Sequence, residues 1–348
     1  MKVLIVGDFR FAYYEQELFN HLERDSRFDV VDSFKVGHYF SYYSYAGFFS
    51  KIFYSIQNRH KIGPVVNKLN RDLISTVENN TYDWVFIWRG IHFTEKTINI
   101  IKQKTVVFGY NNDDTFSKSH PGWLFKNLKK SIFSYDHFFF YRQRELNEYN
   151  GKGSLFLPTV DTVRIHPINN KKKYDIIFIG HFEPDGRDIL ILNLFRNENI
   201  KLGLFGQGWS KSQYYEEIKE HFGDIKPVYD DYNETLNSSK VALCLLSSWN
   251  GDKYTRRTIE IPAAGVAMLA QYTDEQAGFF LPNKEALYFN SYEDALKLAI
   301  YMIDDDLYRE KLARSGYDKF MKSNFTMEHR IDEIIKIAKE INMDRNCS

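Results

Sequence analysis

Short apolar runs alternate with longer amphipathic segments along the whole chain. In the first half the runs occupy residues 3–6, 84–88, 105–110, 137–141 and 155–157. In the second half they occupy residues 175–179, 201–205, 241–246 and 266–270. Continuous apolar runs separated by helix-length segments are typical of parallel strands covered by helices on both faces. The pattern therefore predicts an α/β protein with doubly wound parallel sheets.

A polar segment divides this pattern into two halves. A lysine-rich stretch precedes a fresh strand that ends in Gly180, so we expect a hinge over residues 165–173. The expected domains are residues 1–168 and residues 169–325. Further helices are expected over residues 291–302, where Ser291 and Asp294 form the pattern of a capping box, and over residues 306–315 and 327–341.

Composition and charge exclude several classes of protein. The 348 residues include 46 Lys and Arg and 46 Asp and Glu, so the net charge is zero and a nucleic-acid partner is not expected. Two cysteines, Cys244 and Cys347, cannot build a disulfide framework, which is typical of a reducing compartment. The chain shows neither a signal-peptide pattern nor an apolar run long enough to span a bilayer, so we expect a cytoplasmic protein.

Polar side chains follow the strands of the first half. Ligands of open α/β sheets bind outside the carboxyl ends of the strands, so these side chains are candidates for an acceptor side. A helix-capping turn would explain residues 112–114 equally well, and a lone histidine is more often structural. The candidates are Asp8, Arg89, His92, Asn112, Asp113 and Asp114.

Glycines and cations follow the strands of the second half. Glycine-rich strand ends let backbone N–H groups approach a phosphate. The first strand of the chain, in contrast, lacks the Gly-x-Gly-x-x-Gly pattern, which argues against a dinucleotide oxidoreductase. The candidates for nucleotide binding here are Gly180, His181, Arg187, Gly206, Gly208, Trp209, Val228 and Tyr232.

A charged turn, a short helix and a strand follow one another over residues 252–269. Lys253 and Tyr254 precede Arg256 and Arg257, and Glu260 lies on the same short helix. Cations at a helix N-terminus oppose the helix dipole, so these arginines are better explained as phosphate partners than as helix-stabilising groups. Ion pairs with surface acids, and an exposed carboxylate at position 260, are the structural alternatives.

These motifs together resemble the CgeB-like branch of the group 1 glycosyltransferases. The resemblance rests on residues 257–265, with residues 206–209 before them and residues 284–289 after them. In the first half it rests on residues 83–90, 112–114, 135–137 and 157–161. The resemblance covers residues 2–340.

The resemblance implies a GT-B fold, in which two Rossmann-like domains face a central cleft. It implies a nucleotide-sugar donor in the C-terminal domain, an acceptor on the N-terminal side, and a final helix, residues 326–342, that packs back on the first domain. Glu260 matches a glutamate that binds the ribose hydroxyls of the nucleotide. Asp252 stands where relatives often carry a second glutamate.

The departing diphosphate of such a donor needs a positive partner. Asp304, Asp305 and Asp306 match the metal-binding Asp-x-Asp pattern, but they lie between two expected helices, so we expect a turn and an N-cap. We therefore expect no metal and no cofactor, with Arg187, Lys253, Arg256 and Arg257 on the diphosphate.

The catalytic candidates are Arg257, Asp113 and Asp114. An inverting reaction would need Asp113 or Asp114 as the base, whereas the group 1 resemblance favours the retaining course. The expected function is transfer of a sugar to a glycan or glycoconjugate in bacterial surface polysaccharide assembly. A nucleotide-sugar epimerase and a non-catalytic nucleotide-sugar-binding module are the alternatives.

One aromatic segment of the first half, residues 37–51, suggests a further partner. Residues 1–168 carry 22 basic and 17 acidic side chains, and Lys126, Lys129 and Lys130 lie close together in the chain. A partly buried loop and helix would explain the aromatic segment. A surface for a lipid-linked acceptor, with peripheral contact to the inner face of the membrane, is the alternative.

Overall fold

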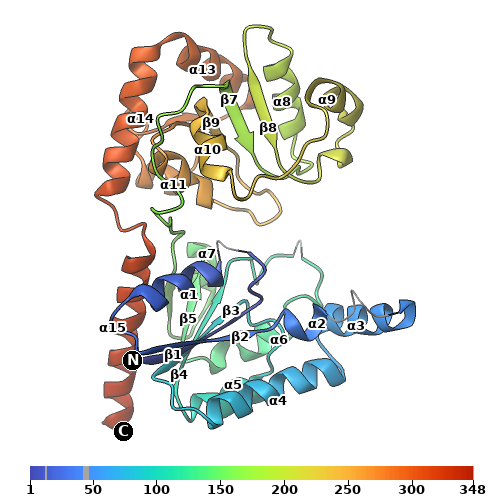
Figure 1. The fold of residues 1–348 in the computed structure, drawn as a ribbon, viewed down its shortest axis with the longest axis vertical. Coiled ribbons are helices and arrows are strands. Elements are labelled where there is room, and N and C mark those ends of the chain that lie inside the picture. The colour runs from blue at the N-terminus through green and yellow to red at the C-terminus, as the bar shows by residue number, and fades with distance from the viewer. Residues whose placement is uncertain (12–13, 42–46, 119, 348) are drawn as a thin grey trace. The chain divides into compact units, whose positions relative to one another are not determined.

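The computed structural model describes residues 1–11, 14–41, 47–118 and 120–347, which form two compact units (Figure 1). The first unit comprises Met1–Leu157 with Met327–Ser348, and the second comprises Pro158–Thr326. Each unit contains one sheet in which neighbouring strands run parallel. The α/β class with doubly wound parallel sheets, predicted from the apolar runs, is confirmed.

The sheet of the first unit has six strands in the order β2-β1-β3-β4-β5-β6. Its strands are β1 (Lys2–Gly7), β2 (Val30–Lys35), β3 (Trp84–Trp88), β4 (Val106–Asn111), β5 (His137–Phe140) and β6 (Gly153–Leu155). The helices of this unit are α1 (Glu15–Arg24), α2 (His38–Ser41), α3 (Phe48–His60), α4 (Pro64–Glu78), α5 (Glu95–Lys102), α6 (Lys126–Ser131), α7 (Gln143–Glu148) and α15 (Met327–Asn346), with the short 3-10 helix η2 (Ile132–Ser134).

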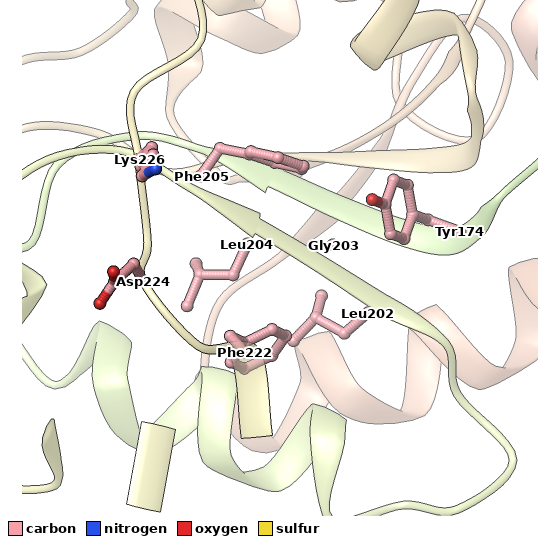
Figure 2. Close-up of a pocket in the computed structure, with 8 residues that line it drawn as sticks. All are labelled: Tyr174, Leu202, Gly203, Leu204, Phe205, Phe222, Asp224 and Lys226. Carbon is pink, nitrogen blue, oxygen red and sulfur yellow. The ribbon is translucent and has the colours of Figure 1, made fainter. Parts of the chain in front are cut away.

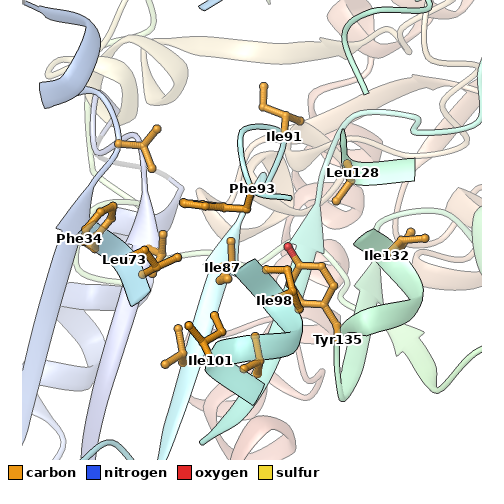
Figure 3. Packing of buried hydrophobic residues seen from close by; sticks show 14 of the residues in the cluster. Phe34, Leu73, Ile87, Ile91, Phe93, Ile98, Ile101, Leu128, Ile132 and Tyr135 are labelled. Carbon is orange, nitrogen blue, oxygen red and sulfur yellow. The ribbon is translucent and has the colours of Figure 1, made fainter. Parts of the chain in front are cut away.

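The two faces of this sheet are buried in different ways. Alternate strand residues such as Val85 and Ile87 pack on the helices α4, α5 and α6, and Figure 3 shows part of this core around Leu73, Ile98 and Leu128. The residues between them form an aromatic layer on the other face, where the rings of Phe86 and Phe139 stack with their centroids 5.8 Å apart. Successive side chains of a strand point to opposite faces of the sheet. Because both faces are buried, every position of the strand is apolar, which explains the continuous apolar runs.

Helix α15 belongs to the first unit although it ends the chain. It packs beside α1 and near β4. Arg345 donates to the carbonyl of Thr105 at 3.2 Å and pairs with Asp136 at 2.7 Å. Arg27 pairs with Asp332 at 2.6 Å. These contacts hold the last helix against the first unit.

The sheet of the second unit has five strands in the order β11-β10-β9-β7-β8. Its strands are β7 (Tyr174–Ile179), β8 (Leu202–Phe205), β9 (Ser239–Cys244), β10 (Ala267–Gln271) and β11 (Leu287–Phe289). Its helices are α8 (Arg187–Phe195), α9 (Tyr215–Phe222), α10 (Tyr232–Asn237), α11 (Arg256–Ala263), α12 (Asp274–Phe279), α13 (Tyr292–Asp304) and α14 (Asp306–Met321), with the 3-10 helix η3 (Trp209–Lys211). The core of this unit joins the strands to α8, α9, α13 and α14.

Two strands and one domain boundary differ from the expectations. The edge strands β2 and β11 were not expected, because polar residues interrupt the apolar ones in β2 and β11 has only three residues. The units divide after Leu157 rather than after residue 168. The segment expected to form a hinge is instead bound to the second unit, since His166 N–H donates to Asn233 Oδ1 at 3.3 Å and Ile168 N–H donates to Asn237 Oδ1 at 3.0 Å.

The helices after β11 follow the pattern with one exception. Ser291 caps α13 by accepting from the N–H of Asp294, as expected. Helix α14, however, continues through Gly316, where the sequence pattern predicted an end. A Cβ at this glycine would lie 2.7 Å from the carbonyl oxygen of Glu285, so the glycine allows close packing rather than ending the helix. Among the described helices, none combines the length and apolar composition needed to cross a bilayer.

The carboxyl ends of β7 and β8 come together through two glycines. Gly206 has φ +140°, and a Cβ built on it would lie 1.9 Å from the carbonyl oxygen of Gly180. The indole N–H of Trp209 donates to the same carbonyl at 3.1 Å. No residue with a side chain fits position 206, so the two strand ends can approach only because this residue is a glycine.

We therefore expect Gly206→Ala to destabilise the second unit by more than about 3 kcal/mol, because both the backbone conformation and the close approach exclude a Cβ. Urea unfolding at equilibrium measures the change. Gly278→Ala is the matched control, since a Cβ there meets nothing within 4 Å, and this change should not destabilise. Equal free energies of unfolding for Gly206→Ala and the natural protein would contradict the packing argument.

Candidate functional site

The carboxyl edge of the second sheet gathers most of the expected nucleotide-binding residues. Gly180 and His181 follow β7, and Gly206, Gly208 and Trp209 follow β8. Gly208 has φ +80°, a conformation that favours glycine. Trp209 is buried and holds the Gly180 carbonyl, so it positions the turn rather than offering a face to a ligand.

Arg257 joins the ends of two strands at this edge. Its guanidinium donates to the carbonyl of Ile179 at 3.0 Å and to that of Leu245 at 2.9 Å. It also lies over the ring of Phe178 at 5.7 Å. Both hydrogen-bond partners are neutral, and the structure gives Arg257 no ion pair among the described residues. The edge therefore carries a positive charge that no carboxylate neutralises.

Glu260 is held between two side chains. The hydroxyl of Tyr232 donates to Glu260 Oε2 at 2.9 Å, and Arg256 Nε donates to Glu260 Oε1 at 3.1 Å. Burial, followed by the charge of Glu260, raises the pKa of Tyr232, so this hydroxyl keeps its proton. The carboxylate is therefore oriented, and its remaining lone pairs are able to accept from further donors.

A capping box places these side chains at the start of α11. Thr255 Oγ1 accepts from the N–H of Arg257 at 3.0 Å, and Thr258 Oγ1 accepts from the N–H of Thr255 at 2.9 Å. The reciprocal bonds fix the first turn of the helix and therefore fix the directions of Arg256 and Arg257.

Arg187 is buried and fully engaged within the protein. It forms a bidentate pair with Asp185 at 2.8 and 2.6 Å. It also donates to the carbonyls of His181 at 2.7 Å and Leu246 at 2.9 Å. With these partners the guanidinium ties the turns after β7 and β9 together. This geometry favours a positioning role over the direct diphosphate contact expected from the sequence.

Three other expected residues of this unit differ in exposure. Lys253 is exposed in the segment before α11, and its carbonyl accepts from Thr273. Tyr254 is buried against Phe279, with the ring centroids 5.1 Å apart. Val228 is half-buried in the segment between α9 and α10. Of the three, only Lys253 presents its side chain to solvent.

His181 lies near the same charges. It is exposed, and partial burial of its ring together with the charge of Arg257 lowers the pKa of its imidazole. The neutral ring is therefore favoured at neutral pH. It can donate one hydrogen bond and accept another.

In the first unit, the residues after β3 and β4 come together. Arg89 has φ +53°, and it pairs with Asp113 at 2.8 Å. Arg142 donates to the carbonyl of Asn112 at 3.1 Å. Asp114 is buried, accepts from the N–H groups of the turn that follows it, and pairs with Arg144.

Asp114 therefore behaves as a capping residue of its loop. The sequence allowed two interpretations of residues 112–114, a helix-capping turn or a carboxylate on the acceptor side. For Asp114 the geometry favours the turn, because both carboxylate oxygens are occupied. Asp113 is the more accessible of the two carboxylates, although it too has a cationic partner.

Asp8 follows β1 and has an unusual environment. Its Oδ2 accepts from Arg10 Nε at 2.6 Å, whereas its Oδ1 is buried without a hydrogen-bond partner. Nearby Glu15 accepts from the N–H of Phe9, and burial raises the pKa of the Glu15 carboxyl. The edge of this sheet thus contains an unsatisfied acceptor beside a carboxyl whose charge is disfavoured.

Lys61 lies with His92 in the same unit, and the sequence reasoning did not find it. Its Nζ is 3.2 Å from His92 Nε2 and 3.1 Å from Asn58 Oδ1. Burial, followed by the charge of Arg89, lowers the pKa of Lys61 to about 8. His92 is buried against Phe40, and its pKa also falls. No local pattern marks Lys61, because its burial depends on segments far away in the chain.

Other features contribute no site residues. A hollow beside β8 is lined by Tyr174, Leu202, Gly203, Leu204, Phe205, Phe222, Asp224 and Lys226, none of which was a candidate (Figure 2).

Asp305 caps α14 by accepting from Tyr308 N–H at 2.9 Å, which confirms the expected turn and N-cap. In the described part of the chain, no three His, Cys, Asp or Glu side chains form a metal cluster. Residues 42–46 of the aromatic segment lie outside the described residues.

The lowered pKa of Lys61 predicts a pH dependence of stability. The unfolded lysine stays protonated to a higher pH than the folded one, so the free energy of unfolding should rise between about pH 8 and 10.5. Lys61→Met should remove this contribution, which amounts to about 3 kcal/mol at most. Urea unfolding across this pH range measures it, with exposed Lys96→Met as the control. The same slope in Lys61→Met and the natural protein would refute the assignment.

A comparison of the sequence with models of protein families finds a match that lies mostly in the second unit. Residues 187–336 match the family model described as glycosyl transferase-like. This range contains β8 to β11, Tyr232, Arg257 and Glu260. No curated protein matched the chain in sequence.

Solved structures match the fold over the whole chain at low identity. A glycosyltransferase from Rickettsia africae has a TM-score of 0.65 and 12% identity, with 98% of each chain covered. HepE from Anabaena in complex with UDP-glucose has a TM-score of 0.63 and 12% identity, with 100% of each chain covered. TarM from S. aureus has a TM-score of 0.57 and 11% identity, and the match covers 78% of this chain but only 59% of TarM.

The two parallel sheets with their helices match those of GT-B glycosyltransferases, as the resemblance implied. The chain therefore has the GT-B fold, and its residues 187–336 match the glycosyl transferase-like family.

Proposed function

We propose that the chain is a glycosyltransferase that moves a sugar from a nucleotide-sugar donor to a glycan or lipid-linked glycan. The observation that carries the proposal is the oriented Glu260 carboxylate beside the unpaired charge of Arg257, at the carboxyl edge of the second sheet. A carboxylate is suited to accept from the two ribose hydroxyls of a nucleotide. A guanidinium is suited to bind its diphosphate.

The donor side uses the residues of the second unit. Tyr232 and Arg256 orient Glu260, while Arg257 and exposed Lys253 carry the charge that a departing diphosphate needs. Gly180 and Gly206 let the ends of β7 and β8 approach, but their N–H groups already donate to the carbonyls of Phe205 and Lys226, so these two glycines shape the turns. Gly208 follows them and keeps this edge free of a side chain. Arg187 acts indirectly by holding the turns after β7 and β9.

The acceptor side uses the residues of the first unit. Asp113 is its most accessible carboxylate, with Arg89 fixing its position. We favour the retaining course, because Asp113 is already paired and Asp114 is buried, so neither carboxylate is a free base. The configuration of the product's anomeric carbon, measured by NMR, distinguishes the two courses.

Bacterial surface polysaccharide assembly is the process we propose for this activity. HepE was solved with UDP-glucose, and the pneumococcal transferase GtfA was solved with UDP and GlcNAc. These ligands make UDP-sugars the first donors to test. A thermal-shift screen against nucleoside diphosphates and nucleotide sugars is the first experiment, because a ligand of the folded state raises the melting temperature.

Donor hydrolysis without acceptor then distinguishes a transferase from a non-catalytic binding module. Release of free sugar and nucleoside diphosphate would support transfer chemistry. Conversion of the donor into a second nucleotide sugar would support an epimerase. Tight binding with neither reaction, even when acceptor glycans are present, would refute the proposal.

Glu260→Gln should weaken binding of the nucleotide that the screen identifies by roughly 10–100-fold, since hydrogen bonds to a charged acceptor contribute about 1.5–3 kcal/mol. Tyr232→Phe should cause a smaller loss, because it only loosens the carboxylate. Isothermal titration calorimetry measures both. Exposed Glu234→Gln on α10 is the control, and an unchanged affinity for Glu260→Gln would rule out the ribose assignment.

Metal independence predicts that EDTA leaves turnover unchanged. Arg257→Gln should lower kcat about 100-fold, since a preorganised donor to a developing charge contributes roughly 3 kcal/mol. Arg257 also bonds two strand ends, so the melting temperature must be compared as well. Lys253→Gln removes a charge without those bonds and should lower kcat with no change in stability. Loss of activity in EDTA, restored by Mg²⁺, would overturn this mechanism.

A further inference from the structure

Helix α3 has an inverted distribution of apolar and polar side chains. Its exposed residues include five large apolar ones, Phe48, Phe49, Ile52, Phe53 and Ile56, of which Phe48 and Phe49 are 73% and 85% exposed. The only buried residue of this helix is polar Gln57, whose side chain accepts from the N–H of Val65 at 2.8 Å. A helix in contact with water normally shows the opposite arrangement.

The spacing places these apolar side chains on one side of α3. Positions 48, 49, 52, 53 and 56 recur at intervals of three and four residues, which brings them onto adjacent turns of one face. A contiguous apolar patch on the surface of a protein marks a contact with a partner or a membrane. The apolar face of α3 is therefore typical of a surface that a partner or a membrane covers.

The chain around this face lacks negative charge. No Asp or Glu occurs between Asp32 and Asp72, a stretch that contains Lys51 and Arg59. A second stretch without acids runs from Asp114 to Asp136 and contains α6. On α6, Lys126, Lys129 and Lys130 are all exposed.

These two acid-free stretches lie side by side in the structure. The guanidinium of Arg59 lies 5.1 Å from the ring of Trp123, and His60 lies 5.9 Å from the same ring. Asn127 of α6 donates to the carbonyl of Lys61 at 3.1 Å. Helix α6, which carries the three lysines, therefore lies next to the C-terminal end of α3.

We propose that α3 and α6 form a docking surface for an anionic lipid bilayer. The aromatic and aliphatic side chains of α3 enter the interface between head groups and acyl chains, and the lysines of α6 contact the anionic head groups. A second copy of the chain fits less well, because pairing two such surfaces would bring basic groups together. The surface lies within the first unit, so the proposal is independent of the donor site.

Co-sedimentation of the full chain with vesicles tests this surface. We expect binding to vesicles of phosphatidylcholine with phosphatidylglycerol, weaker binding to phosphatidylcholine alone, and a loss of the difference at high salt. The double variant Phe48→Ser/Phe49→Ser should lower the partition coefficient at least about tenfold, because apolar burial drives insertion. The triple variant Lys126→Gln/Lys129→Gln/Lys130→Gln should lose a similar factor on anionic vesicles only.

Matched controls come from the second unit. Leu307→Ser removes an apolar side chain that is 84% exposed, and Lys297→Gln/Lys311→Gln/Lys322→Gln removes three exposed lysines. Both should bind vesicles like the natural protein. Melting temperatures and nucleotide binding should be unchanged in every variant, which separates a docking defect from misfolding and from failure of the donor site.

Three results would overturn the proposal. The first is no binding of the natural protein to anionic vesicles. The second is equal loss in the control variants. The third is a dimer, seen by light scattering without lipid, that Phe48→Ser/Phe49→Ser dissociates while vesicle binding stays unchanged, which would assign α3 to a contact between copies of the chain.

Discussion

The close approach of Gly180 and Gly206 is the constraint on which the second unit depends. It brings the ends of β7 and β8 to a distance that no side chain at position 206 would permit. Arg257 then bonds the carbonyls at the ends of β7 and β9, and Trp209 bonds the carbonyl of Gly180. Backbone groups and one cation thereby converge at the carboxyl edge of the sheet, where ligands of α/β proteins bind.

The charged residues of this edge divide into those that hold the protein and those that remain available. Arg187 uses its guanidinium on Asp185 and on two carbonyls, so it supports the turns. Arg257 has neutral partners, and Glu260 is oriented by Tyr232 and Arg256. A preorganised charge of this kind needs little rearrangement when a charged ligand binds, which is the condition for stabilising a departing group.

The first unit combines the same sheet architecture with a different chemistry. Buried Lys61 and His92, together with the paired Arg89 and Asp113, form a polar edge in which several charges are disfavoured by burial. Helix α3, in contrast, exposes apolar side chains to solvent. The anionic bilayer that we propose as its partner would cover these side chains.

The sequence by itself determined the features that depend on neighbouring residues. Apolar runs located most strands, the capping pattern located α13, and residues 252–269 identified the start of α11 with Arg257 and Glu260. Tertiary structure decided which charges are already paired, since Asp114 meets Arg144 and Arg187 meets Leu246 only after distant segments pack. It also decided the burial of Lys61, the unit boundary at Leu157 and the outward face of α3. Burial and pairing are properties of the folded chain, because the residues that cause them are far apart in sequence.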